Sequence, residues 1–141
     1  MQIESFSHGS GQLAYHVVLV PKYRRKIFCI QVLQKRLEEI FRSIASRYDM
    51  VIHALKVLPD HVHVFLSLHP SMSLSRAIQL LKGISSREFM KDFSFLKKKF
   101  RTPCLWSRGK FFRSVGSVTS EAVQYYIEHS QKDTAPFKVR R

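Results

Sequence analysis

The chain has 141 residues, of which 45% are hydrophobic and 12% aromatic, which suits one globular domain and argues against a disordered protein. Lysine and arginine outnumber aspartate and glutamate by 24 to 10, giving a formal net charge of +14. A small domain this basic attracts polyanions, and we expect nucleic acid rather than a membrane, because the sequence has neither a basic amphipathic helix with a bulky apolar face nor a lipidation signal.

Cysteine usage and the first residues bear on location. Cys29 and Cys104 are far apart and form no CxxC pair, which argues against a disulfide framework and a cysteine zinc site. The start of the chain lacks the pattern of a secretory signal, and no apolar run approaches the ~20 residues that span a bilayer. We therefore expect a cytoplasmic protein with a single domain over residues 1–141, a flexible lead-in at 1–12 and an extended arm at 133–141.

Hydrophobic periodicity predicts seven elements in the order strand, helix, strand, strand, helix, strand, helix. Their expected ranges are 13–20, 31–48, 51–58, 61–68, 74–90, 110–115 and 121–131. The first strand is apolar almost throughout, which favours a central place in the sheet, and Ser73 is the expected cap of the second helix. The order predicts an α+β fold of the ferredoxin-like or RRM-like split βαβ type, with a small antiparallel sheet and helices packed on one face.

A histidine pair stands out in the strand expected at 61–68. Side chains alternate along a strand, so His61 and His63 share one face and Val62 and Val64 share the other. Two imidazoles so placed can hold one divalent cation, although such a pair is more often a surface or packing feature. His53 on the adjoining strand is a candidate third ligand, but a packed or exposed side chain is the commoner interpretation.

Basic residues cluster in three places that suit phosphate binding. Lys22, Tyr23, Arg24 and Arg25 follow the first strand, as a phosphate-binding turn with a stacking ring or as a solvated basic turn. Lys82 and Arg87 lie on the second long helix, where Gly83 would allow close approach of a phosphate backbone or another helix. Residues 91–113 interleave cations with aromatic rings, about half of which we expect in the core, and contribute Arg108, Lys110 and Arg113.

Five motifs, in this order, together resemble the single-tyrosine transposases of IS200/IS605-type insertion sequences. They are Pro-Lys-Tyr-Arg-Arg at 21–25, Leu-Pro-Asp-His-Val-His at 58–63, Leu-Lys-Gly-Ile-Ser-Ser-Arg at 81–87, Leu-Trp-Ser-Arg-Gly-Lys-Phe-Phe at 105–112 and Tyr-Ile-Glu at 126–128. The resemblance covers about residues 13–132.

The resemblance implies an enzyme of the histidine-hydrophobic-histidine endonuclease group. His61 and His63 would be metal ligands, with Mg²⁺ or Mn²⁺ favoured, and Tyr126 would be the nucleophile. Such enzymes cut and rejoin single-stranded DNA at insertion-sequence ends through a 5′-phosphotyrosine link and recognise a nearby DNA hairpin. They are homodimers, in which the tyrosine helix of one subunit can serve the histidine pair of the other.

The tyrosine motif departs from the family pattern, in which a glutamine four residues after the tyrosine is the third ligand. Here Ser130 occupies that position and Gln131 follows it, so either residue is a candidate ligand, as are a water molecule, His129 and Glu128. Tyr125 is the rival nucleophile, and Tyr126 is favoured because Ile127 follows it as in the motif.

Two other functions fit the sequence. One is a domesticated relative that processes genomic palindromes, and the other is a noncatalytic ferredoxin-like module that binds nucleic acid.

Overall fold

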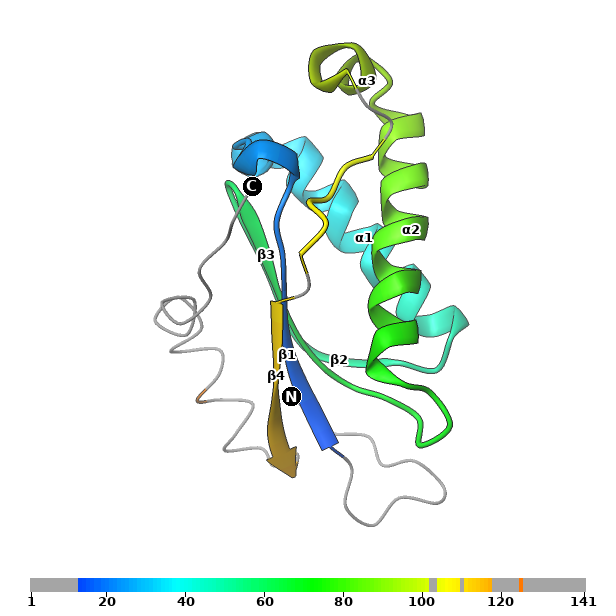
Figure 1. The fold of residues 1–141 in the computed structure, drawn as a ribbon. Helices are drawn as coiled ribbons and strands as arrows, with labels where there is room; N and C mark the ends of the chain where they lie inside the picture. Colours follow the sequence, from blue (N-terminus) through cyan, green and yellow to red (C-terminus); the bar gives the residue numbers. More distant parts are fainter. Residues whose placement is uncertain (1–12, 102–103, 110, 118–124, 126–141) are drawn as a thin grey trace.

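The sheet has four strands and lies beside two long helices. The computed structural model describes residues 13–101, 104–109, 111–117 and 125 (Figure 1). The strands are β1 Leu13–Leu19, β2 Val51–Leu58, β3 His61–Ser67 and β4 Phe111–Ser117. The helices are α1 Gln31–Arg47, α2 Leu74–Asp92 and the short α3 Phe95–Phe100, and two 3-10 turns, η1 Lys22–Arg24 and η2 Ile27–Cys29, follow β1.

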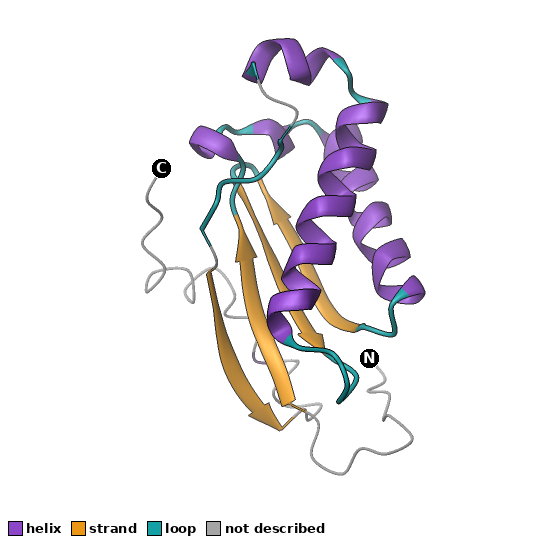
Figure 2. Cartoon of the chain, turned by 45° about the vertical axis from the view of Figure 1, so that its right-hand side comes forward, coloured by secondary structure: helices purple, strands orange, loops and turns teal. Residues whose placement is uncertain are grey.

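The strand order is β2-β3-β1-β4, and every neighbouring pair is antiparallel. Both α1 and α2 lie on one face of this sheet (Figure 2). Each helix connects two strands that are separated in the sheet by a third strand, which is the split βαβ arrangement. The predicted α+β fold is therefore confirmed, including the central position of β1 and the hairpin of β2 and β3.

The core lies between the sheet and the two long helices. Val17 and Leu19 of β1 and Val62, Val64 and Leu66 of β3 supply the sheet side, because alternate strand residues face the helices. The buried stripe of α1 recurs every three or four residues, as an amphipathic helix requires, with Leu33, Leu37, Ile40, Phe41 and Ile44, whereas the neighbouring apolar Val32 is exposed. The predicted cap of α2 is also present, since the Ser73 hydroxyl accepts a hydrogen bond from the Arg76 amide at 3.1 Å.

The segment 91–113, in which cations and aromatic rings alternate, contains more helix than predicted. Here α2 continues to Asp92, and Phe93 packs partly against the core before α3 begins. Trp106 is buried, whereas Phe95 and Phe112 are exposed, so the rings divide between core and surface as expected.

Several predictions fall outside the described residues. Of the helix expected at 121–131 the structure describes only Tyr125, which is helical. The lead-in at 1–12 and the arm at 133–141 also lie outside the described residues. None of the described helices has the length and apolar character needed to cross a membrane.

Candidate active site and nucleic-acid interface

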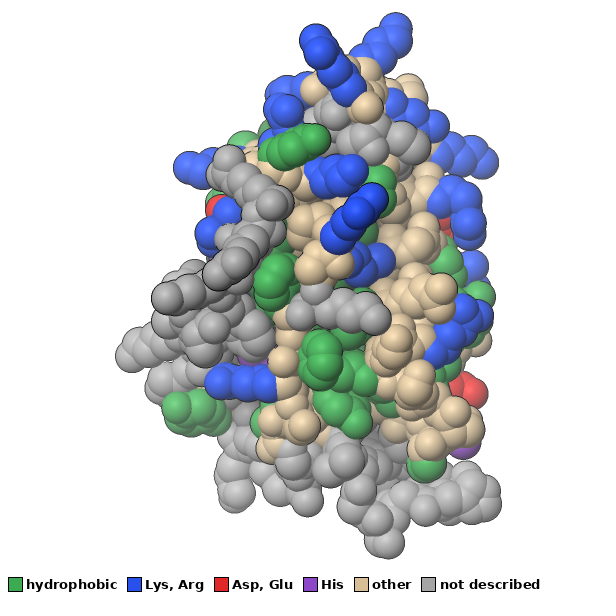
Figure 3. Space-filling model, in the orientation of Figure 1, with side chains coloured by type: hydrophobic (Ala, Val, Ile, Leu, Met, Phe, Trp, Pro, Cys, Tyr) green, Lys and Arg blue, Asp and Glu red, His purple; other side chains and the backbone are tan. Residues whose placement is uncertain are grey.

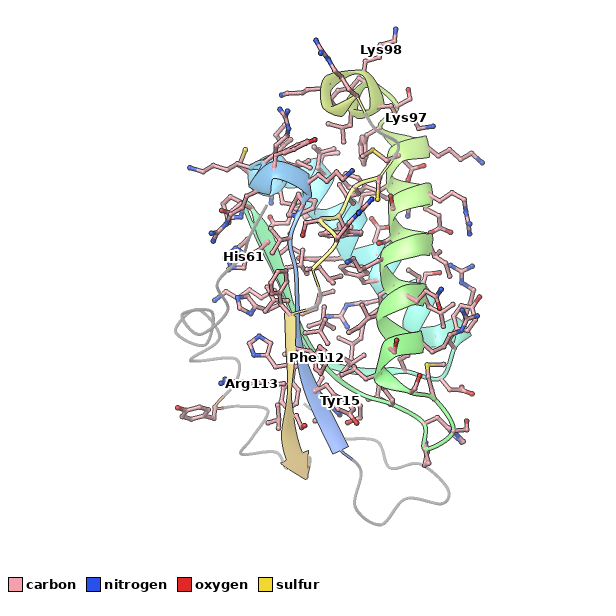
Figure 4. All side chains as sticks on the ribbon, viewed as in Figure 1. Tyr15, His61, Lys97, Lys98, Phe112 and Arg113 are labelled. Carbon is pink, nitrogen blue, oxygen red and sulfur yellow. The ribbon has the colours of Figure 1, made fainter. Side chains whose placement is uncertain are left out.

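The histidine pair lies on the face of β3 that points away from the helices. His61 and His63 share this face, and the rings are 5.0 Å apart between their centroids. His63 is fully buried, and the His61 side chain keeps 15% of its accessible surface. In Figure 4 the labelled His61 lies on the side of the sheet opposite α1 and α2. The neighbouring Val62 and Val64 anchor the strand in the core, which fixes the direction of both imidazoles.

Asp60, in the turn before β3, contacts the first histidine. Its Oδ1 is 2.7 Å from Nδ1 of His61, and its Oδ2 accepts a hydrogen bond from Nε of Arg24 at 3.1 Å. Burial raises the pKa of Asp60, but the hydrogen bond to His61 and the charges of His61 and Arg24 outweigh burial and lower that pKa overall. Asp60 therefore stays ionised and holds the basic turn against the histidine.

His16 of β1 contacts the second histidine. Nε2 of His16 is 2.8 Å from Nδ1 of His63, and both rings are fully buried. Burial is the main reason that the pKa of His63 is lowered to about 3, with further lowering by His16, His61 and Lys56. The His63 ring is therefore neutral at pH 7, which is the form that binds a metal ion.

His53 packs beside this face, which is one of the two alternatives to a ligand role that the sequence left open. Its Nε2 is 2.8 Å from the Ser67 hydroxyl, and its ring meets Phe65 edge-on at 5.4 Å between centroids. His53 is 3% exposed and is held within the sheet by these two contacts.

The two histidines fit a divalent cation. Nε2 of His61 and Nε2 of His63 are both buried and have no hydrogen-bond partner among the described residues, although a buried polar nitrogen ordinarily has one. Within the described part of the chain, no third histidine, cysteine or carboxylate joins them in a group able to hold a metal. A further ligand would thus come from water, from DNA or from residues outside the described ranges.

The remaining predicted catalytic residues fall mostly outside the described ranges. Tyr126, Ser130 and Gln131 all do. Tyr125, the rival nucleophile, is described and its side chain is 59% exposed.

A basic pocket of about 660 Å³ lies between α2 and the segment 104–109. Lysine and arginine side chains gather over α2, α3 and the neighbouring segment, as Figure 3 shows. The pocket combines five cations with a buried indole and small side chains. Its lining residues are Lys22, Lys82, Gly83, Ser86, Arg87, Met90, Lys97, Cys104, Trp106, Ser107 and Arg108.

Hydrogen bonds from α2 build one wall of the basic pocket. The Ser85 hydroxyl accepts from the Trp106 indole at 2.9 Å, and the Ser86 hydroxyl accepts from the Leu105 amide at 2.9 Å. Lys82 donates to the carbonyls of Ser107 and Gly109 at 2.8 and 3.1 Å. The motifs at 81–87 and 105–112 are thus one structural unit.

Comparison with known proteins assigns the family. A family model described as "Transposase IS200 like" matches residues 10–130. The chain belongs to the IS200-like transposase family. It is 32% identical to the transposase for insertion sequence element IS200 of Salmonella typhimurium over 92% of this chain and 84% of that one. It is 34% identical to the ISDra2 transposase TnpA of Deinococcus radiodurans over 86% of each chain.

Solved structures agree with this IS200-like assignment. A crystal structure assigned as a transposase from Deinococcus radiodurans R1 superposes with a TM-score of 0.70 at 25% identity, covering 93% of this chain and 97% of that one. A REP-associated tyrosine transposase bound to a REP hairpin shares the fold, with a TM-score of 0.56 at 12% identity, over 96% of this chain and 74% of that one.

The residues predicted to contact DNA in this IS200-like chain divide among three places. Lys22, Lys82, Arg87 and Arg108 line the basic pocket, and so does Lys97, which was not singled out from the sequence. Some of the predicted DNA contacts also bind within the protein. Lys82 of the pocket donates to backbone carbonyls, and Arg24 of the basic turn binds Asp60.

The other predicted DNA contacts lie elsewhere. Tyr23 is 54% exposed, and the Arg25 guanidinium carbon is 5.6 Å from the centre of its ring. Arg113 pairs with His16 across β4 and β1, so it belongs to the histidine face and not to the pocket. Lys110 lies outside the described residues.

Sequence analysis missed two residues of the histidine face. His16 interrupts an otherwise apolar strand, and Asp60 directly precedes the histidine pair. A polar side chain inside an apolar strand and a carboxylate beside a candidate ligand are both signals that the sequence contains.

Proposed function

We propose that the chain cleaves and rejoins single-stranded DNA at insertion-sequence ends through a 5′-phosphotyrosine intermediate on Tyr126. His61 and His63 would hold Mg²⁺ or Mn²⁺, with Gln131 or Ser130 as a further ligand. The observation that carries this proposal is the pair of buried Nε2 atoms without partners among the described residues, on one strand face of an IS200-like transposase.

The residues have a defined division of labour in this reaction. A divalent metal held by the two histidines would polarise the scissile phosphate and offset charge that builds on its oxygens. The Tyr126 phenol loses its proton and attacks phosphorus, the bond to the 3′ oxygen breaks, and that oxygen takes up a proton to become a free 3′-hydroxyl. The phosphotyrosine ester conserves the energy of the broken phosphodiester bond, so rejoining needs no nucleoside triphosphate.

The basic pocket supports recognition of the DNA, in single-stranded or hairpin form. Lys22, Arg87, Lys97 and Arg108 offer cations to phosphates, and Trp106 and Met90 give the pocket an apolar side. The structural neighbour bound to a REP hairpin makes a hairpin a reasonable substrate to test first.

A homodimer is part of the proposal. β4 is one of the two edge strands of the described sheet, and its Phe112 and Val115 are 46% and 38% exposed. An exposed edge with apolar side chains suits pairing with a second copy. A monomeric mass in solution at working concentration would contradict this part.

The proposal predicts a covalent product on one tyrosine. The protein is mixed with a hairpin-bearing oligonucleotide from an insertion-sequence end, labelled at its 3′ terminus, because the 3′ fragment carries the 5′ phosphate that joins the enzyme. With Mg²⁺ or Mn²⁺ we expect a labelled protein band, which Tyr126→Phe and His61→Ala abolish. Tyr125→Phe is the matched control and should keep the adduct.

An adduct yield unchanged by both Tyr126→Phe and His61→Ala would overturn the mechanism. DNA binding without any adduct, and without a metal requirement, would instead support the noncatalytic module. A domesticated relative would give the same adduct on genomic palindromes, with no matching palindromes flanking its own coding region.

A further inference from the structure

Two hydrogen bonds on the histidine face end on the Nδ1 atoms of the proposed metal ligands. Asp60 contacts Nδ1 of His61 at 2.7 Å, and His16 contacts Nδ1 of His63 at 2.8 Å. The Nε2 atoms of both ligands are buried and have no hydrogen-bond partner among the described residues. Each ring is thus held at one nitrogen and has the other nitrogen available.

The contact with Asp60 determines which nitrogen of His61 carries the proton. An ionised carboxylate only accepts hydrogen bonds, so Nδ1 of His61 must be the donor. In a neutral ring the lone pair then lies on Nε2, the atom able to bind a cation.

The contact between His16 and His63 joins two rings that can each donate or accept. If His16 donates, His63 carries its proton on Nε2 and cannot bind a cation there. If Nε2 of His16 accepts, His63 is protonated on Nδ1 and its Nε2 has a free lone pair. Metal binding by His63 therefore requires His16 to be the acceptor, with its own proton on Nδ1.

We propose that His16 and Asp60 are positioning residues that hold His63 and His61 in the Nδ1-protonated form and present both Nε2 lone pairs to one divalent cation. The inference rests on the proposed metal site and adds two residues to it. Partners of this kind, which contact a ligand and not the metal, fix the ring orientation of metal-binding histidines.

The surroundings of both residues suit this role. His16 is fully buried in a strand whose neighbours Ala14, Val17 and Val18 are apolar, so packing alone would be served by an apolar side chain. Asp60 has Arg24 as its neighbour, whose side chain donates a hydrogen bond to the second carboxylate oxygen of Asp60. The backbone of Arg24 is left-handed, with φ of 52°, which is uncommon for a residue other than glycine. The basic turn is thereby connected to one metal ligand.

The first test reads the tautomers directly in the metal-free, full-length protein. Long-range ¹H–¹⁵N correlation NMR at neutral pH distinguishes a ring protonated on Nδ1 from one protonated on Nε2. We expect His16, His61 and His63 all to carry the proton on Nδ1. A His63 ring protonated on Nε2 would overturn the assignment for His16, and a His61 ring protonated on Nε2 would overturn the assignment for Asp60.

The second test measures Mn²⁺ affinity from the electron paramagnetic resonance signal of free Mn²⁺, with an uncleavable hairpin oligonucleotide present. His16→Phe keeps a ring but removes the acceptor, and Asp60→Ala removes the carboxylate. Each should weaken Mn²⁺ binding about 10- to 100-fold. His16→Gln, whose amide oxygen can accept from Nδ1 of His63, should restore most of the affinity, and thermal melts report whether each variant is folded.

The outcomes separate this inference from the proposed function. Wild-type affinity in His16→Phe and Asp60→Ala, combined with a large drop in affinity in His63→Ala, would overturn the positioning roles and leave the metal site intact. Affinity unchanged by His61→Ala and His63→Ala would overturn the metal site and the positioning roles together. If His16→Phe does not fold, the NMR tautomers of the wild-type protein decide the question.

Discussion

At the scale of single residues, the adjacent serines Ser85 and Ser86 of α2 decide where the segment 104–109 lies. The indole of Trp106 is 2% exposed, and its N–H donates to the Ser85 hydroxyl at 2.9 Å. A buried indole N–H without a partner is costly, so this hydrogen bond locks the segment against α2. The wall of the basic pocket therefore depends on a side chain that the sequence presents as one more polar position on a helix.

Ser85→Ala should leave the Trp106 N–H buried and unpaired, which costs about 1–3 kcal/mol of the free energy of unfolding. Urea denaturation of the wild-type and variant proteins measures the difference. Ser46→Ala, an exposed serine on α1, is the matched control and should change the free energy by no more than about 0.5 kcal/mol. Equal stability of Ser85→Ala and wild type would mean that this hydrogen bond is not needed to hold Trp106.

At the scale of elements, α2 serves the core with one side and the basic pocket with the other. Ile78, Leu81 and Phe89 are buried, whereas Lys82, Gly83 and Arg87 line the pocket. Gly83 is unfavourable in the middle of a helix, and a Cβ added there would meet no atom within 4 Å. The glycine is therefore not required by packing among the described residues, which favours the predicted close approach of a phosphate backbone.

Gly83→Ala should separate stability from DNA binding. The free energy of unfolding should rise by up to about 1 kcal/mol, because alanine is the better helix former and nothing described opposes its methyl group. Affinity for a hairpin oligonucleotide, measured by fluorescence anisotropy, should fall because the methyl group enters the pocket.

Gln79→Ala is the control for this comparison, since it changes an exposed position of α2 outside the pocket. It should leave the DNA affinity unchanged. If Gly83→Ala were more stable than wild type and bound the hairpin equally well, the glycine would have no role in DNA approach.

At the scale of the whole molecule, the excess of 14 positive charges acts on any polyanion, but the cations are not equivalent. Five of them line one pocket, while others, such as Lys35 and Arg42, lie exposed on α1 away from it. Counterion release from DNA depends on how many phosphates the protein neutralises, so the salt dependence of binding reports which cations take part.

Replacing Arg87 and Arg108 together by glutamine should flatten the plot of log affinity against log salt concentration. For single-stranded DNA, the slope should become shallower by about 0.7 for each phosphate that the double variant no longer neutralises. The charge-matched control replaces Lys35 and Arg42 by glutamine. Anisotropy titrations at several salt concentrations measure both slopes, and an equal change in the two double variants would mean that Arg87 and Arg108 neutralise no more phosphates than Lys35 and Arg42.

Residue periodicity within single segments predicted most of the helices and strands and part of the candidate site. Alternation along a strand places His61 and His63 on one face, and helical periodicity identifies the buried stripe of α1, because both depend on repeats within one element. The short helix α3 was missed, since its three consecutive lysines suggest a basic surface segment.

The order of the four strands and the two long helices, the shared face of the histidine pair and the family all follow from the amino-acid sequence. The contact of His16 with His63 does not, because it depends on the pairing register of β1 with β3, which are separated by a helix and another strand. The enclosure of one basic pocket by Lys22, α2 and residues 104–109 likewise emerges only from tertiary packing. Such contacts arise when distant segments pack on a common core, and no local repeat encodes them.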